Sequence, residues 1–218
     1  QNARLHWSEE QWRLHRWAYC RLTERVDRQI GRVLDALQET GLAENTLVIL
    51  TSDHGDMDAA HRLEHKTVFY EEAARVPLII RAPGQKSPGR VDDHLVSNGL
   101  DLFPTICDYA GVKPPPGLQG LSLRALIEGE LPARWRENLF VESQIGYMVT
   151  DGRYKYCAYD PDKGTLRDSF VDLERDPGEM LNLVGEGFTR KQVREFQQVM
   201  ASWQRQNGIE SPMPELNS

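Results

Sequence analysis

Residues 47–66 read LVILTSDHGDMDAAHRLEHK, an apolar run that ends in Asp53 and His54 and is followed by two more histidines and Lys66. A short apolar run rich in β-branched residues is typical of a strand buried on both faces of a parallel sheet. In open α/β sheets, functional side chains collect where such strands end. The stretch therefore predicts an α/β fold with a functional site at the exit of this strand.

The neighbouring sequence extends this pattern. An amphipathic pattern over residues 8–41 begins with the N-cap candidate Ser8 and predicts one long helix or two. RVPLIIRAPG at residues 75–84 repeats the character of a buried strand, and residues 61–74 have helical composition. Together they predict a strand, loop, helix and strand in succession. Residues 101–111 predict a further short helix that starts at an aspartate and ends at a glycine.

The pattern changes after about residue 132. Short runs with alternation or aromatic residues are separated by Asp-Gly and Asp-Pro turn signals, which favours an antiparallel sheet. A last helix over residues 188–206 would cover one face of this sheet. We therefore predict an α/β portion at 1–132 and a small α+β subdomain at 133–218. The residues of the last helix expected to face inward are Val193, Phe196, Val199, Met200 and Trp203.

Composition excludes some classes of function. The 218 residues include 26 Lys and Arg against 33 Asp and Glu, and the net charge of −7 without a basic block argues against binding to nucleic acid or to anionic membrane. Three widely spaced cysteines indicate neither a disulfide framework nor a cysteine zinc site. No apolar run approaches the length of a membrane span, and the first residues do not resemble a signal peptide. The compartment is not readable from these features.

The residues at the strand exit suit the binding of a metal and an anion. A carboxylate beside a neutral imidazole makes half of a divalent metal site, so Asp53 and His54 need further ligands. Lys66 would add a positive charge that suits sulfate or phosphate oxygens. The alternative is a turn that ends the strand and caps a helix, and a match of four residues does not exclude it.

The same stretch contains a competing motif. His61-Arg-Leu-Glu-His65 fits H-x-x-E-H, in which two histidines one helical turn apart bind zinc in a protease. This interpretation leaves Asp53, His54 and Lys66 without a role. The motif also requires a third ligand, for which Glu71, Glu72 and Glu142 are only nominal candidates.

Residues 46–84 resemble the second signature region of type I sulfatases, a branch of the alkaline phosphatase superfamily. Residues 21–55 and 93–123 resemble the segments on either side of that region. DGRYKYCAYD at 151–160 and FVDLERDPGEMLNL at 170–183, with its Asp-Pro-x-Glu-x-x-Asn-Leu pattern, resemble the family's C-terminal subdomain. The resemblance implies the C-terminal part of an alkaline-phosphatase-like parallel or mixed sheet with flanking helices, followed by the α+β subdomain.

The resemblance also implies roles for single residues. Asp53 and His54 match ligands of a divalent cation, usually calcium in sulfatases. Many relatives have Asn where this chain has His54, and the Asp-His version also occurs in phosphonate and phosphate ester hydrolases, where manganese or zinc serves. Lys66 matches a lysine that contacts the anionic oxygens of the substrate, and His61 matches a histidine at the rim of the pocket, with a structural role as its alternative. We expect His94 to be structural or exposed.

One family feature is not found in this chain. Sulfatases cleave with a formylglycine made from the Cys or Ser of C/S-x-P-x-R, and no cysteine or serine here has that context. The resemblance therefore implies the C-terminal portion of a sulfuric ester hydrolase, inactive in isolation, with the nucleophile upstream. Its substrate would be a small-molecule or carbohydrate sulfate ester. The alternatives are a phosphonate or phosphate monoester hydrolase and a non-catalytic assembly module. An apolar edge left open predicts self-association or pairing with an N-terminal half.

Overall fold

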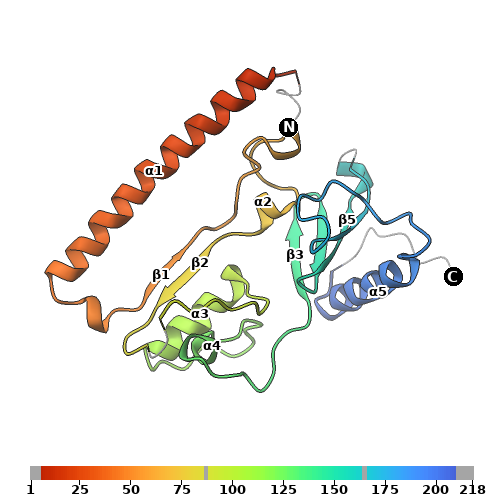
Figure 1. Ribbon diagram of the computed structural model, residues 1–218. Coiled ribbons are helices and arrows are strands. Elements are labelled where there is room, and N and C mark those ends of the chain that lie inside the picture. Colours follow the sequence, from red (N-terminus) through yellow and green to blue (C-terminus); the bar gives the residue numbers. More distant parts are fainter. Residues whose placement is uncertain (1–5, 86–87, 164–165, 210–218) are drawn as a thin grey trace. The chain divides into compact units, whose positions relative to one another are not determined.

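The computed structural model describes residues 6–85, 88–163 and 166–209 (Figure 1). Contacts divide the chain into two compact units. Unit 1 comprises Gln1–Lys66 and Glu72–Arg134, and unit 2 comprises Thr67–Glu71 and Trp135–Ser218. The chain therefore leaves unit 1 after Lys66 for five residues before it returns. The boundary expected between residues 132 and 133 stays a prediction.

Unit 1 begins with one long helix, α1 (Glu9–Glu39). Ser8 caps it: the Gln11 amide donates to Ser8 Oγ at 3.3 Å, and the Ser8 amide donates to Gln11 Oε1 at 2.8 Å. This reciprocal capping box satisfies backbone donors that the first turn leaves open. The predicted start of the helix is confirmed, and the pattern forms a single helix. Trp12 is its only buried residue within the described part of the chain.

The apolar stripe of α1 is largely exposed. Leu22 and Val26 each expose 58% of their surface and Val33 exposes 68%. Because a helix without apolar burial is only marginally stable in water, this stripe needs a covering surface. No helix of residues 6–85, 88–163 and 166–209 is long and apolar enough to cross a membrane.

The strands β1 (Val48–Thr51) and β2 (Leu78–Arg81) pair antiparallel, with Val48 opposite Arg81 and Thr51 opposite Leu78. The expectation that these two runs lie parallel is wrong. A parallel pair needs a long crossover, usually a helix, that returns the chain to the same end of the sheet. The connection here contains no such helix.

The predicted helix over residues 61–74 is also wrong. The structure places there only the 3-10 turn η2 (Ala60–Arg62) and the short helix α2 (Glu71–Ala74). Right-handed helix cannot propagate through left-handed backbone, which costs about 1–2 kcal/mol for each non-glycine residue. Six non-glycine residues in the stretch 58–67 have positive φ: Asp58, Ala59, His61, Arg62, His65 and Thr67.

After β2, unit 1 continues into α3 (Asn98–Tyr109) and α4 (Arg124–Glu128). The predicted helix at 101–111 therefore exists but starts three residues earlier. Asp101 is fully buried and is not the N-cap. Its carboxylate accepts from the Ser97 amide and from the Leu121 amide, both at 2.8 Å. It thereby fixes a loop against the helix.

Unit 2 contains the predicted antiparallel sheet. Its strands β3 (Leu139–Ser143), β4 (Gly146–Thr150), β5 (Tyr154–Tyr159) and β6 (Ser169–Asp172) pair in sequence order. All three pairings are antiparallel. The alternating and aromatic runs thus form a meander, as predicted.

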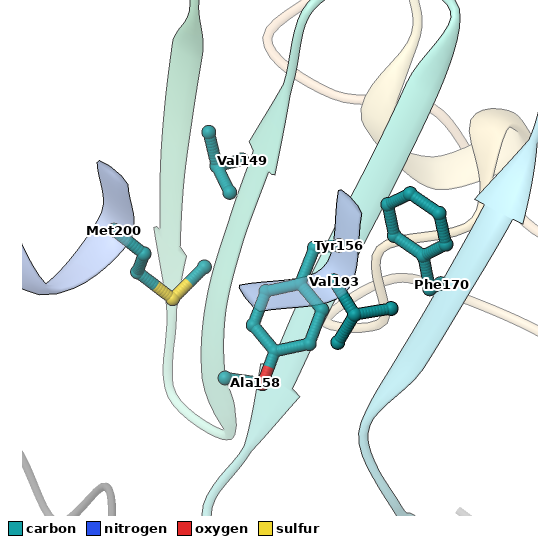
Figure 2. Packing of buried hydrophobic residues seen from close by; sticks show 6 residues of the cluster. All are labelled: Val149, Tyr156, Ala158, Phe170, Val193 and Met200. Atoms are coloured by element: carbon teal, nitrogen blue, oxygen red, sulfur yellow. The ribbon is translucent and has the colours of Figure 1, made fainter. Parts of the chain in front are cut away.

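Helix α5 (Arg190–Gln206) packs on this sheet and completes the core of unit 2. Figure 2 shows Val193 and Met200 of the helix beside the strand residues of the core. The indole of Trp203 stacks on Phe140 with ring centroids 4.8 Å apart. The predicted inward face of this helix is confirmed. The residues of the core cluster are Val149, Tyr156, Ala158, Phe170, Val193 and Met200.

Candidate metal and anion site

Hydrogen bonds fix the backbone at the exit of β1. The Ser52 hydroxyl donates to the His54 carbonyl at 2.7 Å, and the His54 amide donates to Asp53 Oδ1 at 3.0 Å. The Asn98 side-chain amide donates to the Ser52 carbonyl and, at 3.2 Å, to the Asp53 carbonyl. Sequence reasoning missed Asn98. Its position after Ser97 at the start of a helix was a weak signal, because nothing local links it to a strand 45 residues earlier.

Gly55 allows a close approach of two backbones. Its amide donates to the Ala73 carbonyl at 2.9 Å. A Cβ atom at this position would lie 1.9 Å from the Glu72 carbonyl oxygen, far inside contact distance. The glycine of Ser-Asp-His-Gly is therefore required by packing against α2.

The side chains expected at the site converge in unit 1. Asp53 Oδ2 lies 3.3 Å from His54 Nε2, and Lys66 Nζ contacts the same nitrogen. His54 Nδ1 lies 2.8 Å from the Gly55 carbonyl oxygen. Because a carbonyl only accepts, this contact requires a proton on Nδ1, so in the neutral ring the lone pair is on Nε2, facing Asp53 and Lys66.

This arrangement fits two ligands of a divalent cation. A carboxylate oxygen and an imidazole lone pair 3.3 Å apart can both reach one ion, and a carbonyl partner on the other ring nitrogen is the usual support of a ligating histidine. The hydrogen bond from the His54 amide lowers the pKa of Asp53, which keeps this carboxylate ionised and able to bind a cation. The exposed Asp53 side chain leaves room for additional ligands.

The other histidines of the stretch lie on left-handed backbone. His61 has φ 51° and ψ 21° and is half-buried in η2, and His65 has φ 66° and is exposed. The H-x-x-E-H motif needs both histidines on one face of a helix. Since residues 61–65 form no such helix, the zinc protease interpretation is wrong. The role of His61 at the pocket rim stays a prediction.

Contacts from α1 hold the loop that precedes Lys66. Within unit 1, His15 Nε2 lies 3.7 Å from Asp58 Oδ1, and Arg62 pairs with Glu9 at 3.0 Å. Burial raises the pKa of Asp58. The Met57 amide donates to the His65 carbonyl at 2.8 Å, which closes the loop just ahead of Lys66.

A second group of possible ligands lies elsewhere in unit 1. Atoms of Asp92, Asp93 and His94 that could bind a metal all lie within 4.8 Å of one another. Asp92 also pairs with Arg90 at 3.0 Å and with His94 Nδ1 at 2.7 Å. Neighbouring exposed groups of this kind are common on protein surfaces, and the sequence prediction for His94 was a structural or exposed role.

Comparisons with known proteins identify similar chains. A family model described as Sulfatase matches residues 6–112. A delta 4,5-hexuronate-2-O-sulfatase from Bacteroides thetaiotaomicron is 37% identical over 188 residues, which cover 82% of this chain and 38% of that protein.

Solved structures give the same result. A 2-O GAG sulfatase superposes with a TM-score of 0.84 at 34% identity, over 92% of this chain and 45% of its own. The phosphonate monoester hydrolase of Agrobacterium radiobacter has a TM-score of 0.72 at 30% identity, over 83% of this chain and 39% of its own. The predicted fold class is confirmed by these neighbours. The chain spans less than half the length of each of these three relatives.

Proposed function

Because this chain belongs to the sulfatase family, we propose that it acts as the C-terminal portion of a sulfuric ester hydrolase. The observation that carries this proposal is the convergence of Asp53 Oδ2 and Lys66 Nζ on His54 Nε2. These three groups offer an anionic ligand, a neutral ligand and a cation at one strand exit. That combination suits a metal ion beside a tetrahedral oxyanion.

Each residue has a proposed task. Asp53 and His54 hold a divalent cation, for which calcium is the first expectation and manganese or zinc the alternatives. When bound, this ion supplies Lewis acid chemistry at the reacting oxygens. Lys66 binds the oxygens of the sulfate group and neutralises the charge that develops on them. His61 is proposed to contact the substrate at the rim. The nucleophile, a formylglycine in this family, is proposed to lie outside this chain.

We propose a sulfated carbohydrate as the substrate class, because relatives with this chemistry are named as a hexuronate-2-O-sulfatase and an N-acetylglucosamine-6-O-sulfatase. A phosphonate or phosphate monoester is the second candidate. The observation in its favour is the likeness to phosphonate monoester hydrolases, together with His54 at the second ligand position.

The chain alone is expected to be inactive. It carries two proposed ligands and no family nucleophile, and an incomplete shell binds metal weakly. The alternative of a different class is a non-catalytic assembly module.

An assay with two reporter substrates tests the proposal. An aryl sulfate and an aryl phosphate are each offered to the 218-residue chain and to the product of its complete reading frame, with calcium or manganese added. We expect sulfate turnover by the complete product alone, lost in Lys66→Ala. Turnover by the 218-residue chain would contradict its proposed inactivity. A complete reading frame without C/S-x-P-x-R would favour the assembly module.

A further inference from the structure

The five residues that follow Lys66 are anchored at alternate positions within unit 2. The Ser143 hydroxyl donates to the Thr67 carbonyl at 2.9 Å. Phe69 exposes 2% of its surface, and its ring lies 5.5 Å from that of Tyr159. The Glu71 amide donates to a carboxylate of the subdomain at 2.6 Å. A segment fixed at its first, third and fifth residues has little freedom to move within unit 2.

A buried lysine is the centre of this anchorage. Lys155 in β5 is 0% exposed. Its ammonium lies 2.8 Å from the Phe69 carbonyl, 2.9 Å from Glu71 Oε1 and 2.6 Å from Glu179 Oε1. Three acceptors thus match its three donors. Burial alone would lower the pKa of Lys155, and the two carboxylates outweigh this and raise it, so the ammonium stays charged.

Glu179 joins the lysine to the segment. One oxygen of its carboxylate pairs with Lys155 and the other accepts from the Glu71 amide. Its backbone has φ 52°, a left-handed conformation that is costly for a non-glycine residue and persists only where its surroundings hold it. Glu179 is the glutamate of the Asp-Pro-x-Glu-x-x-Asn-Leu pattern. The pattern therefore has a structural task in this chain, which is to present one carboxylate to two partners.

A buried ion triad can specify the arrangement of the groups that it joins. Replacing a buried ion group with apolar residues of similar volume is often neutral or stabilising, whereas its directional bonds specify one arrangement. The arrangement specified here is that of residues 67–71, which begin where Lys66 ends. Lys66 itself lies between two anchored carbonyls, that of His65 in unit 1 and that of Thr67 in unit 2.

We propose that Lys155, together with Glu71 and Glu179, is a positioning residue for Lys66. By fixing the peptide that continues from Lys66, the triad limits the positions that the Lys66 ammonium can take. This inference rests on the proposed function, because only an anion-binding Lys66 needs to be positioned.

Amide hydrogen exchange tests the anchorage without any catalytic assay. In Lys155→Met, exchange of residues 67–71 should become faster by about tenfold or more, because the variant removes the ammonium that contacts the Phe69 carbonyl and the carboxylates of Glu71 and Glu179. The matched control is Lys163→Met, which removes an exposed lysine of the same unit. It should leave exchange in this segment unchanged. Equal protection of residues 67–71 in Lys155→Met and in the wild type would overturn the proposal.

A milder variant covers the case in which Lys155→Met fails to fold. Glu71→Gln leaves Lys155 paired with Glu179 and with the Phe69 carbonyl. Its faster exchange should be confined to residues 67–71. Unchanged exchange, or an increase spread over the whole of unit 2, would overturn the inference.

Lysine resonances test the effect on Lys66 itself. The sequence has six lysines, so spectra of protein labelled at the lysine ε-carbon are simple, and Lys66→Arg identifies one signal. Inorganic sulfate should shift the Lys66 signal of the wild type, and Glu71→Gln should raise the sulfate concentration needed by about threefold or more. If Glu71→Gln and the wild type have the same midpoint in the sulfate titration, the triad does not position Lys66. A wild-type Lys66 signal that does not shift when sulfate is added would contradict the proposed function. The hydrogen-exchange experiment would still test the anchorage of residues 67–71.

Discussion

At the scale of single residues, the sequence sufficed to select the groups that converge. Asp53, His54 and Lys66 could be named because their types and spacing match a chemistry. Gly55 and Asn98 were not given a role, because each acts through a partner distant in the sequence. A close approach to Glu72 or a bond to a strand end leaves no local pattern.

The close approach at Gly55 gives a first prediction. In Gly55→Ala, the new Cβ atom collides with the Glu72 carbonyl oxygen and must displace either the strand exit or α2. We expect a loss of about 1–3 kcal/mol in the free energy of unfolding. Urea denaturation followed by circular dichroism measures it.

The control for this prediction is Gly31→Ala in α1, where no atom lies within 4 Å of the new Cβ. This change should stabilise the chain by about 0.5–1 kcal/mol, because alanine is the better helix former. If both substitutions change the free energy of unfolding in the same direction, steric crowding at Gly55 does not explain the effect of Gly55→Ala.

At the scale of elements, the helices and strands that could be predicted are those whose own residues carry a periodic apolar pattern. Helices α1 and α5 have periodic apolar residues, and both were predicted. Residues 61–74 have helical composition, yet their contacts with α1 and within unit 2 hold them in another conformation. The direction in which β1 and β2 pair was predicted wrongly, because a strand's own residues do not record the orientation of its partner.

The buried thiol and phenol groups of β5 predict that the free energy of unfolding decreases at alkaline pH. Burial raises the pKa of the Cys157 thiol from 9.0 to about 12, and burial also raises the pKa of Tyr156 and Tyr159. Each group keeps its proton longer in the folded state than in the unfolded state. Stability from such a group is complete below the unfolded pKa and is lost as the pH rises toward the folded pKa.

Each of these groups should therefore reduce the free energy of unfolding by about 1.4 kcal/mol per pH unit within its window. Chemical denaturation between pH 8 and pH 10.5 measures the slope. Cys157→Ala should flatten it above pH 9, where the thiol begins to contribute. A slope that is identical in wild type and Cys157→Ala, or a stability that rises with pH, would disprove this assignment.

At the scale of the whole molecule, the division into units was only partly foreseeable. A change in pattern near residue 132 indicated two parts. The inclusion of Thr67–Glu71 in unit 2 was not indicated, because it depends on Lys155 and Glu179, which follow by more than 80 residues. Long-range ion pairs of this kind have no local signature.

The exposed stripe of α1 predicts self-association of the 218-residue chain. The side chains of Leu22, Val26 and Val33 expose apolar surface to water, and contact between two chains would bury it. We expect the mass measured by light scattering after size exclusion to rise with concentration. Leu22→Glu combined with Val26→Glu should reduce this association, whereas Gln29→Glu combined with Gln38→Glu adds the same charge and should have less effect. A monomer at every concentration would refute the prediction.

The central claim is that Asp53 and His54 share one divalent cation beside Lys66. Paramagnetic Mn²⁺ tests it directly, because it broadens the signals of nearby imidazoles even when binding is weak, and the sequence has only six histidines. The account predicts that His54 broadens first, that excess Ca²⁺ restores its signal, and that Asp53→Asn abolishes the effect while Asp93→Asn does not. Broadening of His94 with His54 unaffected would contradict the account and assign the cation to Asp92 and Asp93 instead.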